Sequence, residues 1–176
     1  ANQKMAGLET RDQAKTFIYA FLYGASPPKI GSIIGKDARA GYRLIDKFLK
    51  AMPKLSKFRE RTMMEAEESN MIKGLDGRYF HIKSSHSAVN TLLQGAGAII
   101  CKEWLYHITN YIEDKGLNAK AVANIHDEVQ FEVHKLDAEE FCTVSKQAMK
   151  DTEESLSVRC PLDSEAKIGL NWSETH

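Results

Sequence analysis

This sequence of 176 residues is poor in cysteine and has no long hydrophobic run. Its three cysteines show no Cys-x-x-Cys spacing, which argues against a disulfide framework and a zinc site: Cys101, Cys142 and Cys160. The most apolar stretch, residues 96–101, is far too short to cross a membrane, and no signal peptide is apparent. We therefore expect a cytoplasmic protein without a membrane partner.

The formal net charge is zero, but the charges are unevenly distributed. The chain up to Arg61 has 13 Lys and Arg against 5 Asp and Glu, and the remainder has 11 against 19. A basic first part favours attraction to phosphate groups, and an acidic second part favours cation binding. Charged helix faces such as residues 65–68 more often serve only as solvated surface.

A stripe of two cations and two aromatic rings is predicted on one helix near the start of the chain. Arg11, Lys15, Tyr19 and Tyr23 follow one another at intervals of four. Each such step advances about 40° beyond a full helical turn, so the four side chains share one slowly winding face. Cations suit the phosphates of a nucleoside triphosphate, and rings suit its sugar and base. Spacing alone also allows a solvated charged face with two packed tyrosines.

The ends of this helix are marked in the sequence. Thr10 and Gln13 fit a capping box, and Gly24 suits a helix stop. We therefore predict a helix over about residues 10–24.

A polar triplet lies between two β-prone runs in residues 121–133. The triplet is His126, Asp127 and Glu128, and the apolar residues that follow alternate as on a half-buried strand. Carboxylates at such a turn can hold the divalent cations that phosphoryl transfer requires. Taken alone, such a triplet is more often an ordinary polar turn between strands.

A long amphipathic helix is predicted from Ser87 to Lys115. Its apolar stripe consists of Val89, Leu92, Leu93, Ala96, Ile100 and Trp104. Asn90 and Gln94 lie four residues apart, away from that stripe. Their amides can bond the acceptors that every base pair presents in the minor groove, although polar residues on an outer face usually meet only water.

Together these segments resemble the motifs of family-A DNA polymerases, in the family's order. Residues 11–24 resemble motif B, the fingers helix of the family. This motif has Arg, then Lys, then Phe or Tyr, then Tyr-Gly, at intervals of four residues. The sequence of this segment looks most like the bacteriophage branch. Residues 126–128 match the His-Asp-Glu of motif C. Residues 73–78, with an Asp-Gly turn, and residues 160–176 also resemble the family, so the likeness runs nearly end to end.

The resemblance implies roles for the residues of the first helix. Arg11 and Lys15 are expected to bind the dNTP triphosphate, and Lys15 could act as general acid toward pyrophosphate. Tyr19 is expected against the sugar, and Tyr23 near the templating base. Family members with tyrosine at the position of Tyr19 generally accept dideoxynucleotides, so the same is expected here.

The resemblance also implies a two-metal site and contacts to DNA. Asp127 is expected as a Mg²⁺ ligand, with Glu128 a weaker or outer-shell partner. His126 is expected at the primer terminus, and Asn90 and Gln94 at the primer–template duplex. Two Mg²⁺ ions are the family expectation, completed by a carboxylate that this chain lacks, because motif A has no counterpart here.

We therefore expect an upstream polymerase piece that carries motif A, a thumb and possibly an exonuclease. The chain itself would be inactive alone, either as a natural subunit of a split polymerase or as an experimental fragment. A non-catalytic DNA-binding module or a truncated inactive polymerase fragment is the alternative. In a phage, the location would be the host cytoplasm.

The predicted fold class is α+β. Residues 1–70 are expected to form helical fingers, and residues 71–176 the C-terminal part of a palm with a small antiparallel sheet. A helix is predicted over Asp137–Ser155 and a final strand over Pro161–Ile168.

Overall fold

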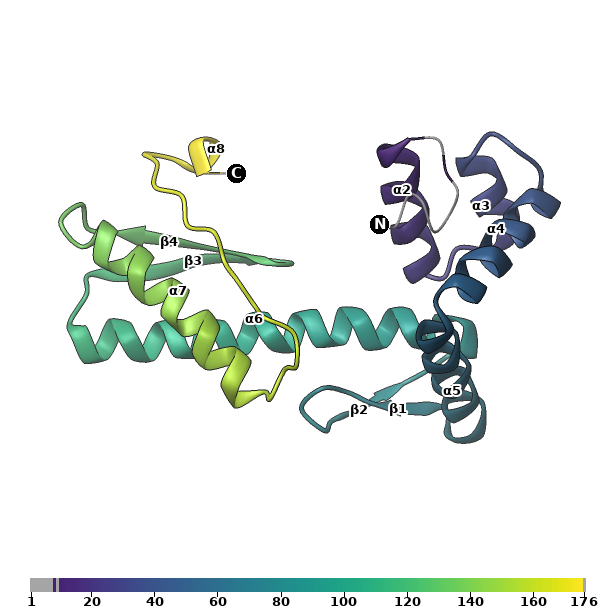
Figure 1. Ribbon diagram of the computed structural model, residues 1–176. Helices are drawn as coiled ribbons and strands as arrows, with labels where there is room; N and C mark the ends of the chain where they lie inside the picture. Colours follow the sequence, from purple (N-terminus) through teal and green to yellow (C-terminus); the bar gives the residue numbers. More distant parts are fainter. Residues whose placement is uncertain (1–7, 9, 176) are drawn as a thin grey trace. The chain divides into compact units, whose positions relative to one another are not determined.

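The computed structural model describes residue 8 and residues 10–175, so the first residues of the predicted fingers and His176 lie outside the described part. The elements, in chain order, are α2 (Arg11–Leu22), α3 (Pro27–Ile33), α4 (Ala38–Ala51), α5 (Pro53–Ser69), β1 (Met71–Lys73), β2 (Tyr79–His81), a 3₁₀ turn (Ser85–Ser87), α6 (Ala88–Lys115), β3 (Ala119–Ile125), β4 (Glu128–Val133), α7 (Ala138–Ser155) and α8 (Trp172–Thr175) (Figure 1). The predicted α+β class is confirmed. The described strands form two separate antiparallel pairs, β1–β2 and β3–β4.

The chain divides into two compact units, Ala1–Gln94 and Gly95–His176. Helix α6 begins in the first unit and continues into the second. This division by contacts does not test the functional boundary between fingers and palm near residue 70, which stays a prediction.

The first unit packs α2, α3 and α4 around an aromatic and aliphatic core. Its fully buried members are Phe17, Ile30, Leu44 and Phe48. Helices α3 and α4 approach closely because Gly41 has no side chain: a Cβ there would lie 2.0 Å from the Pro27 carbonyl oxygen. Pro53 occupies the first position of α5, where its missing N–H costs nothing.

A smaller core in the same unit joins α5 to the β1–β2 hairpin and the start of α6. Ala66, Ile72, Ile82 and Ala88 are buried together. The hairpin turn contains Gly77 at a φ of 86°, which confirms the Asp-Gly turn predicted from the sequence.

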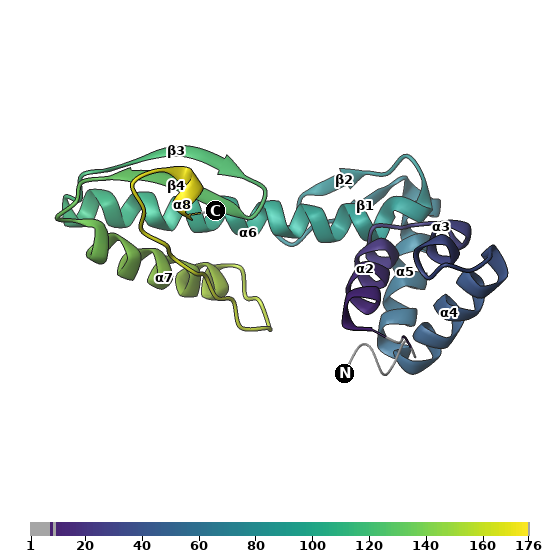
Figure 2. The ribbon, with the colours of Figure 1, turned by 90° about the horizontal axis from the view of Figure 1, so that it is seen from above.

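The second unit packs α6, α7 and the β3–β4 hairpin around one core. Trp104 and Ile108 of α6 meet Ala148 and Met149 of α7, and Phe131 of β4 packs against them. The two strands run alongside α6 in Figure 2. Helix α7 agrees with the helix predicted to Ser155.

The apolar stripe predicted on α6 is partly wrong. Leu93 is 41% exposed, whereas Ile99, Cys101 and Ile108 are buried. The reason is that α6 contributes to two cores, one at Ala88 and the other at Trp104 and Ile108. The apolar face at the start of the helix therefore differs from the apolar face further along it. A single stripe along the whole helix cannot describe both.

The final strand predicted over Pro161–Ile168 is also wrong, because these residues form no strand. The backbone of Leu162 instead bonds side chains of α7: its N–H donates to Glu153 Oε2 at 2.8 Å, and its carbonyl accepts from Lys150. A strand needs a neighbouring strand for its backbone groups, and here α7 meets part of that need.

Among the helices in the described part of the chain, none combines the length and the apolar character that crossing a membrane requires.

Candidate functional site

Helix α2 forms where the sequence predicts it. Thr10 precedes the helix, and its Oγ1 accepts a hydrogen bond from the Gln13 N–H at 3.1 Å. Tyr23 caps the other end, and Gly24 follows at a φ of 75°, a conformation that favours glycine. Both helix ends thus follow from local sequence.

The four predicted side chains lie on the exposed face of α2. Arg11 and Lys15 are exposed, and Tyr19 and Tyr23 are 50% and 54% exposed. The opposite face carries Phe17, which is completely buried. Burial of that face therefore leaves the cations and the rings accessible to a ligand.

The two tyrosines form an aromatic surface at the end of this stripe. Their ring centroids are 6.2 Å apart and the ring planes differ by 27°. Next to them, Asp12, Lys15, Thr16, Tyr19 and Ala20 line a shallow hollow. The predicted spacing thus brings Lys15 and Tyr19 to one surface.

Asn90 and Gln94 lie in the first turns of α6. Gln94 is exposed, but Asn90 is half-buried, and its Oδ1 atom is buried without a hydrogen-bond partner among the described residues. Asn90 is therefore less accessible than an outer-face amide would be.

The predicted polar triplet forms the tip of the β3–β4 hairpin. Ile125 pairs with Glu128, so His126 and Asp127 make a two-residue turn. His126 has a φ of 56°, as such tight turns require. Both turn residues are exposed, whereas Glu128 is half-buried on the strand.

The charge of Asp127 acts on a buried thiol of α6. Burial raises the pKa of Cys101 above its ordinary value of 9.0, and the negative charge of Asp127 raises it further. The hairpin tip therefore lies close enough to α6 for the two groups to interact.

The side chain of Glu128 is held by two residues that the sequence reasoning did not single out as its partners. Its Oε1 accepts hydrogen bonds from Gln130 Nε2 and from Trp172 Nε1, the second at 3.0 Å. Gln130 lies two positions along the same strand, and this spacing could have indicated a shared face. Trp172 is 44 positions away and could not be found this way.

Asp127 and Glu128 contribute carboxylates to the hairpin, but the described residues contain no group of three or more His, Cys, Asp or Glu that could hold a metal ion. Two carboxylates fit part of a Mg²⁺ site, because Mg²⁺ commonly takes one or two carboxylates together with water and substrate phosphates. The donor set thus fits half of a site.

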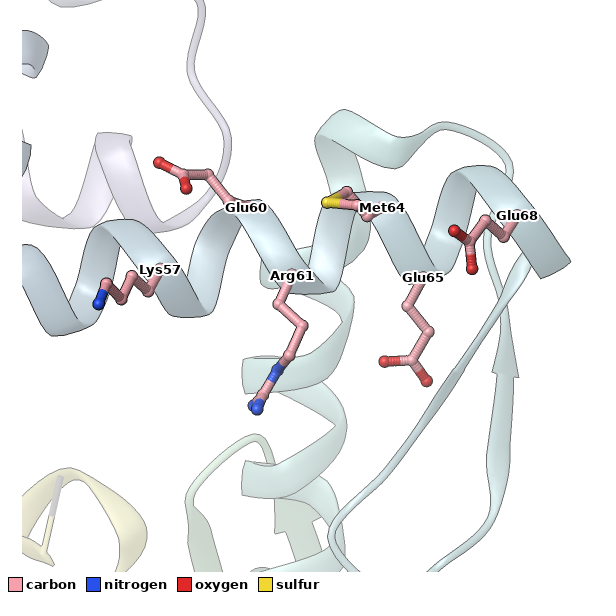
Figure 3. A pocket seen from close by; sticks show the side chains of 6 residues that line it. All are labelled: Lys57, Glu60, Arg61, Met64, Glu65 and Glu68. Atoms are coloured by element: carbon pink, nitrogen blue, oxygen red, sulfur yellow. The ribbon is translucent and has the colours of Figure 1, made fainter.

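A second shallow hollow lies on α5. Figure 3 shows the six side chains that line it: Lys57, Glu60, Arg61, Met64, Glu65 and Glu68. Two cations and three carboxylates on one helix face give no preference for a ligand of either charge, so we assign it no role.

Comparison with known proteins agrees with these motifs. The structure resembles one described as the POL domain of Pol1 from M. smegmatis in complex with DNA primer-template and dNTP, with a TM-score of 0.77. The likeness covers 86% of this chain and 30% of that one at 16% identity, so it shows the fold alone.

Sequence comparison shows the family. The family model described as DNA polymerase family A matches residues 2–174. The DNA-directed DNA polymerases of Enterobacteria phage T3 and Escherichia phage T7 are 41% and 39% identical over 99% of this chain. The chain therefore belongs to DNA polymerase family A, and it spans 28% of the length of these two relatives.

Proposed function

We propose that this chain supplies the fingers, residues 1–70, and the C-terminal palm portion, residues 71–176, of a DNA-directed DNA polymerase. It would add dNTPs to a primer by two-metal nucleotidyl transfer. An upstream piece with motif A and a thumb would complete the catalytic site.

The exposed Asp127 at a two-residue hairpin turn, directly before Glu128, is the observation that carries this proposal. A turn between paired strands fixes the backbone on both sides, so a carboxylate there is presented in a defined place. The phage relatives are named as DNA-directed DNA polymerases, which supports the same function.

On α2, the stripe would receive the incoming nucleotide. Arg11 and Lys15 would bind the triphosphate, and Lys15 would give a proton to the leaving pyrophosphate. The exposed ring of Tyr19 would lie against the sugar, and Tyr23 near the templating base. The buried opposite face of the helix supports this arrangement, since it fixes which side chains are presented.

At the hairpin, Asp127 would be a Mg²⁺ ligand and Glu128 a weaker or outer-shell one. Two ions, when bound, would stabilise the charge on the transferring phosphoryl group. His126 would touch the primer terminus. Gln94 is exposed and would contact the duplex; Asn90 would do so through its amide nitrogen, because its Oδ1 is buried.

Primer extension tests the proposal. The chain would be assayed with Mg²⁺ and dNTPs, first alone and then mixed with an upstream piece of a phage-type family-A polymerase that carries motif A and the thumb. The upstream piece alone is the matched control. We expect activity only in the mixture.

Each other outcome has a defined meaning. Activity of this chain alone would contradict the requirement for an upstream carboxylate. An inactive mixture that still binds primer-template DNA would favour a non-catalytic DNA-binding module or an inactive fragment. Circular dichroism of the chain would verify that it is folded in each assay.

A further inference from the structure

The C-terminal helix α8 is bonded to the same hairpin strand as the proposed metal site. Trp172 Nε1 donates to Glu128 Oε1 at 3.0 Å, and Gln130 Nε2 donates to the same oxygen. The Thr175 hydroxyl donates to Gln130 Oε1 at 3.4 Å. Two residues of α8 therefore contact two side chains of β4.

The chain end that carries α8 is held in place by bonds of its own. The Leu170 N–H and the Asn171 side-chain amide donate to the two carboxylate oxygens of Glu174, each at 2.8 Å. Gly169 lies so close that a Cβ would be 2.7 Å from the Glu174 Cβ. These contacts fold residues 169–175 into a compact turn, which carries the indole of Trp172.

Residues 156–171, which connect α7 to α8 and are called the tail below, are anchored to α7. Leu162 packs against the core of the second unit and bonds Glu153 and Lys150 through its backbone. The tail runs from the end of α7 to α8 beside the hairpin in Figures 1 and 2. Both ends of the tail are thus attached to the unit that carries Asp127 and Glu128.

From these contacts we propose that Trp172 is a positioning residue for Glu128, an inference that rests on the proposed polymerase function. An ionised carboxylate oxygen offers about two lone-pair sites, and two N–H donors occupy them at Oε1. The carboxylate is thereby fixed in one orientation, as hydrogen-bonded partners commonly fix the carboxylates that bind metal ions.

The contact itself can be tested by NMR, without any catalytic assay. The chain has two tryptophans, so two indole N–H signals are expected. Trp104 Nε1 donates to the Ser145 carbonyl in the core at 2.8 Å and serves as an internal control. Substitution Glu128→Ala should shift the Trp172 signal and speed its exchange with solvent, while the Trp104 signal stays in place.

The matched control is Glu132→Ala, which removes an exposed carboxylate from the same strand. The proposal would be overturned if Glu128→Ala left the position and the solvent exchange of the Trp172 signal unchanged. It would also be overturned if Glu132→Ala changed them by the same amount. A displaced Trp104 signal would reveal a folding defect, and Glu128→Leu, which keeps most of the size of the side chain but has no acceptor, would then decide by the same two signals.

The catalytic consequence is tested in the mixture with the upstream piece. Trp172→Phe keeps a ring but removes the donor, and it should raise the Mg²⁺ concentration for half-maximal extension about 10-fold. In a Glu128→Ala background the same substitution should have no further effect, because its target is gone. Leu170→Ala, at a side chain that is 96% exposed, should leave the Mg²⁺ dependence unchanged.

Equal effects of Trp172→Phe with and without Glu128 would show that it acts through general stability and would refute positioning. If the wild-type mixture were inactive, the proposed polymerase function would be refuted, and the catalytic role of the Trp172–Glu128 contact would be refuted with it. The indole signals would still decide whether Trp172 holds Glu128, so the two failures are distinguishable.

Discussion

Phe17 packs edge-on against Phe48, with ring centroids 5.2 Å apart and an interplanar angle of 88°. Phe17 is completely buried on α2, and Phe48 is buried on α4. This contact secures the inner face of the helix whose outer face carries Arg11, Lys15 and the two tyrosines. The orientation of the candidate nucleotide surface thus depends on a side chain that touches no ligand.

Substitution Phe17→Ala should therefore destabilise the first unit. We expect a loss of about 3–5 kcal/mol in the free energy of unfolding, because a buried ring is replaced by a cavity. Urea denaturation followed by circular dichroism measures this loss. Phe17→Leu should cost much less, and an equal cost for both would show that ring packing is not the main contribution.

Lys15→Ala should weaken use of the incoming nucleotide. Loss of a charged hydrogen bond worth about 1.5–3 kcal/mol lowers kcat/KM for dNTP by roughly 10- to 150-fold in the mixture with the upstream piece. Lys47→Ala, an exposed lysine on α4 of the same unit, is the control. An equal loss in both variants would indicate a general charge effect in place of a specific contact.

Tyr19→Phe should increase discrimination against dideoxynucleotides. The substitution keeps the ring that stacks on Tyr23 and removes only the hydroxyl. The ratio of dideoxynucleotide to dNTP incorporation measures the effect, with Tyr42→Phe on α4 as the control. An unchanged ratio would contradict the role proposed for the hydroxyl.

Asp127→Ala should abolish extension while sparing DNA binding. Removal of a metal ligand costs several kcal/mol of transition-state stabilisation, which corresponds to roughly a 1,000-fold loss or more. Single-turnover extension and a DNA-binding titration separate the two properties. Glu132→Gln on the same hairpin should stay active, and full activity of Asp127→Ala would refute the proposed site.

Stability at alkaline pH should depend on Tyr111. Its hydroxyl donates to Asp151 Oδ2 at 2.8 Å. This hydrogen bond is the main cause, and burial a smaller one, of a pKa of Tyr111 that lies above its ordinary value of 10.0. The unfolded chain therefore releases this proton first, so the contribution is complete below pH 10.0 and is lost as the pH rises through the folded-state pKa.

Urea denaturation on both sides of pH 10.0 checks this sign. The wild type should lose more stability across that range than Tyr111→Phe, which has no hydroxyl to ionise. If both lost the same amount, the bond to Asp151 would not shift the titration of Tyr111.

Local sequence was sufficient to predict the elements that carry the site. The cap at Thr10, the stop at Gly24 and the alternation after Glu128 depend on neighbouring residues, so α2 and the β3–β4 hairpin formed as predicted. The period of four also placed the four side chains of the stripe on one face of α2, but spacing alone did not decide whether the two tyrosines would be exposed or packed.

Contacts between distant parts of the chain were not predictable in this way. The apolar face of α6 changes because two cores use the same helix, and residues 161–168 follow α7 in place of a strand. Both outcomes depend on which surfaces meet, and periodicity within one segment carries no such information.

The sequence by itself determined the family, the two motif-bearing elements and the residue types at the candidate site. Tertiary structure decided how Glu128 is held, because its partner Trp172 lies 44 positions away and is brought to it only by the packing of the folded chain. A hydrogen bond between distant residues depends on the folded backbone, so local propensity could provide the carboxylate but not its orientation.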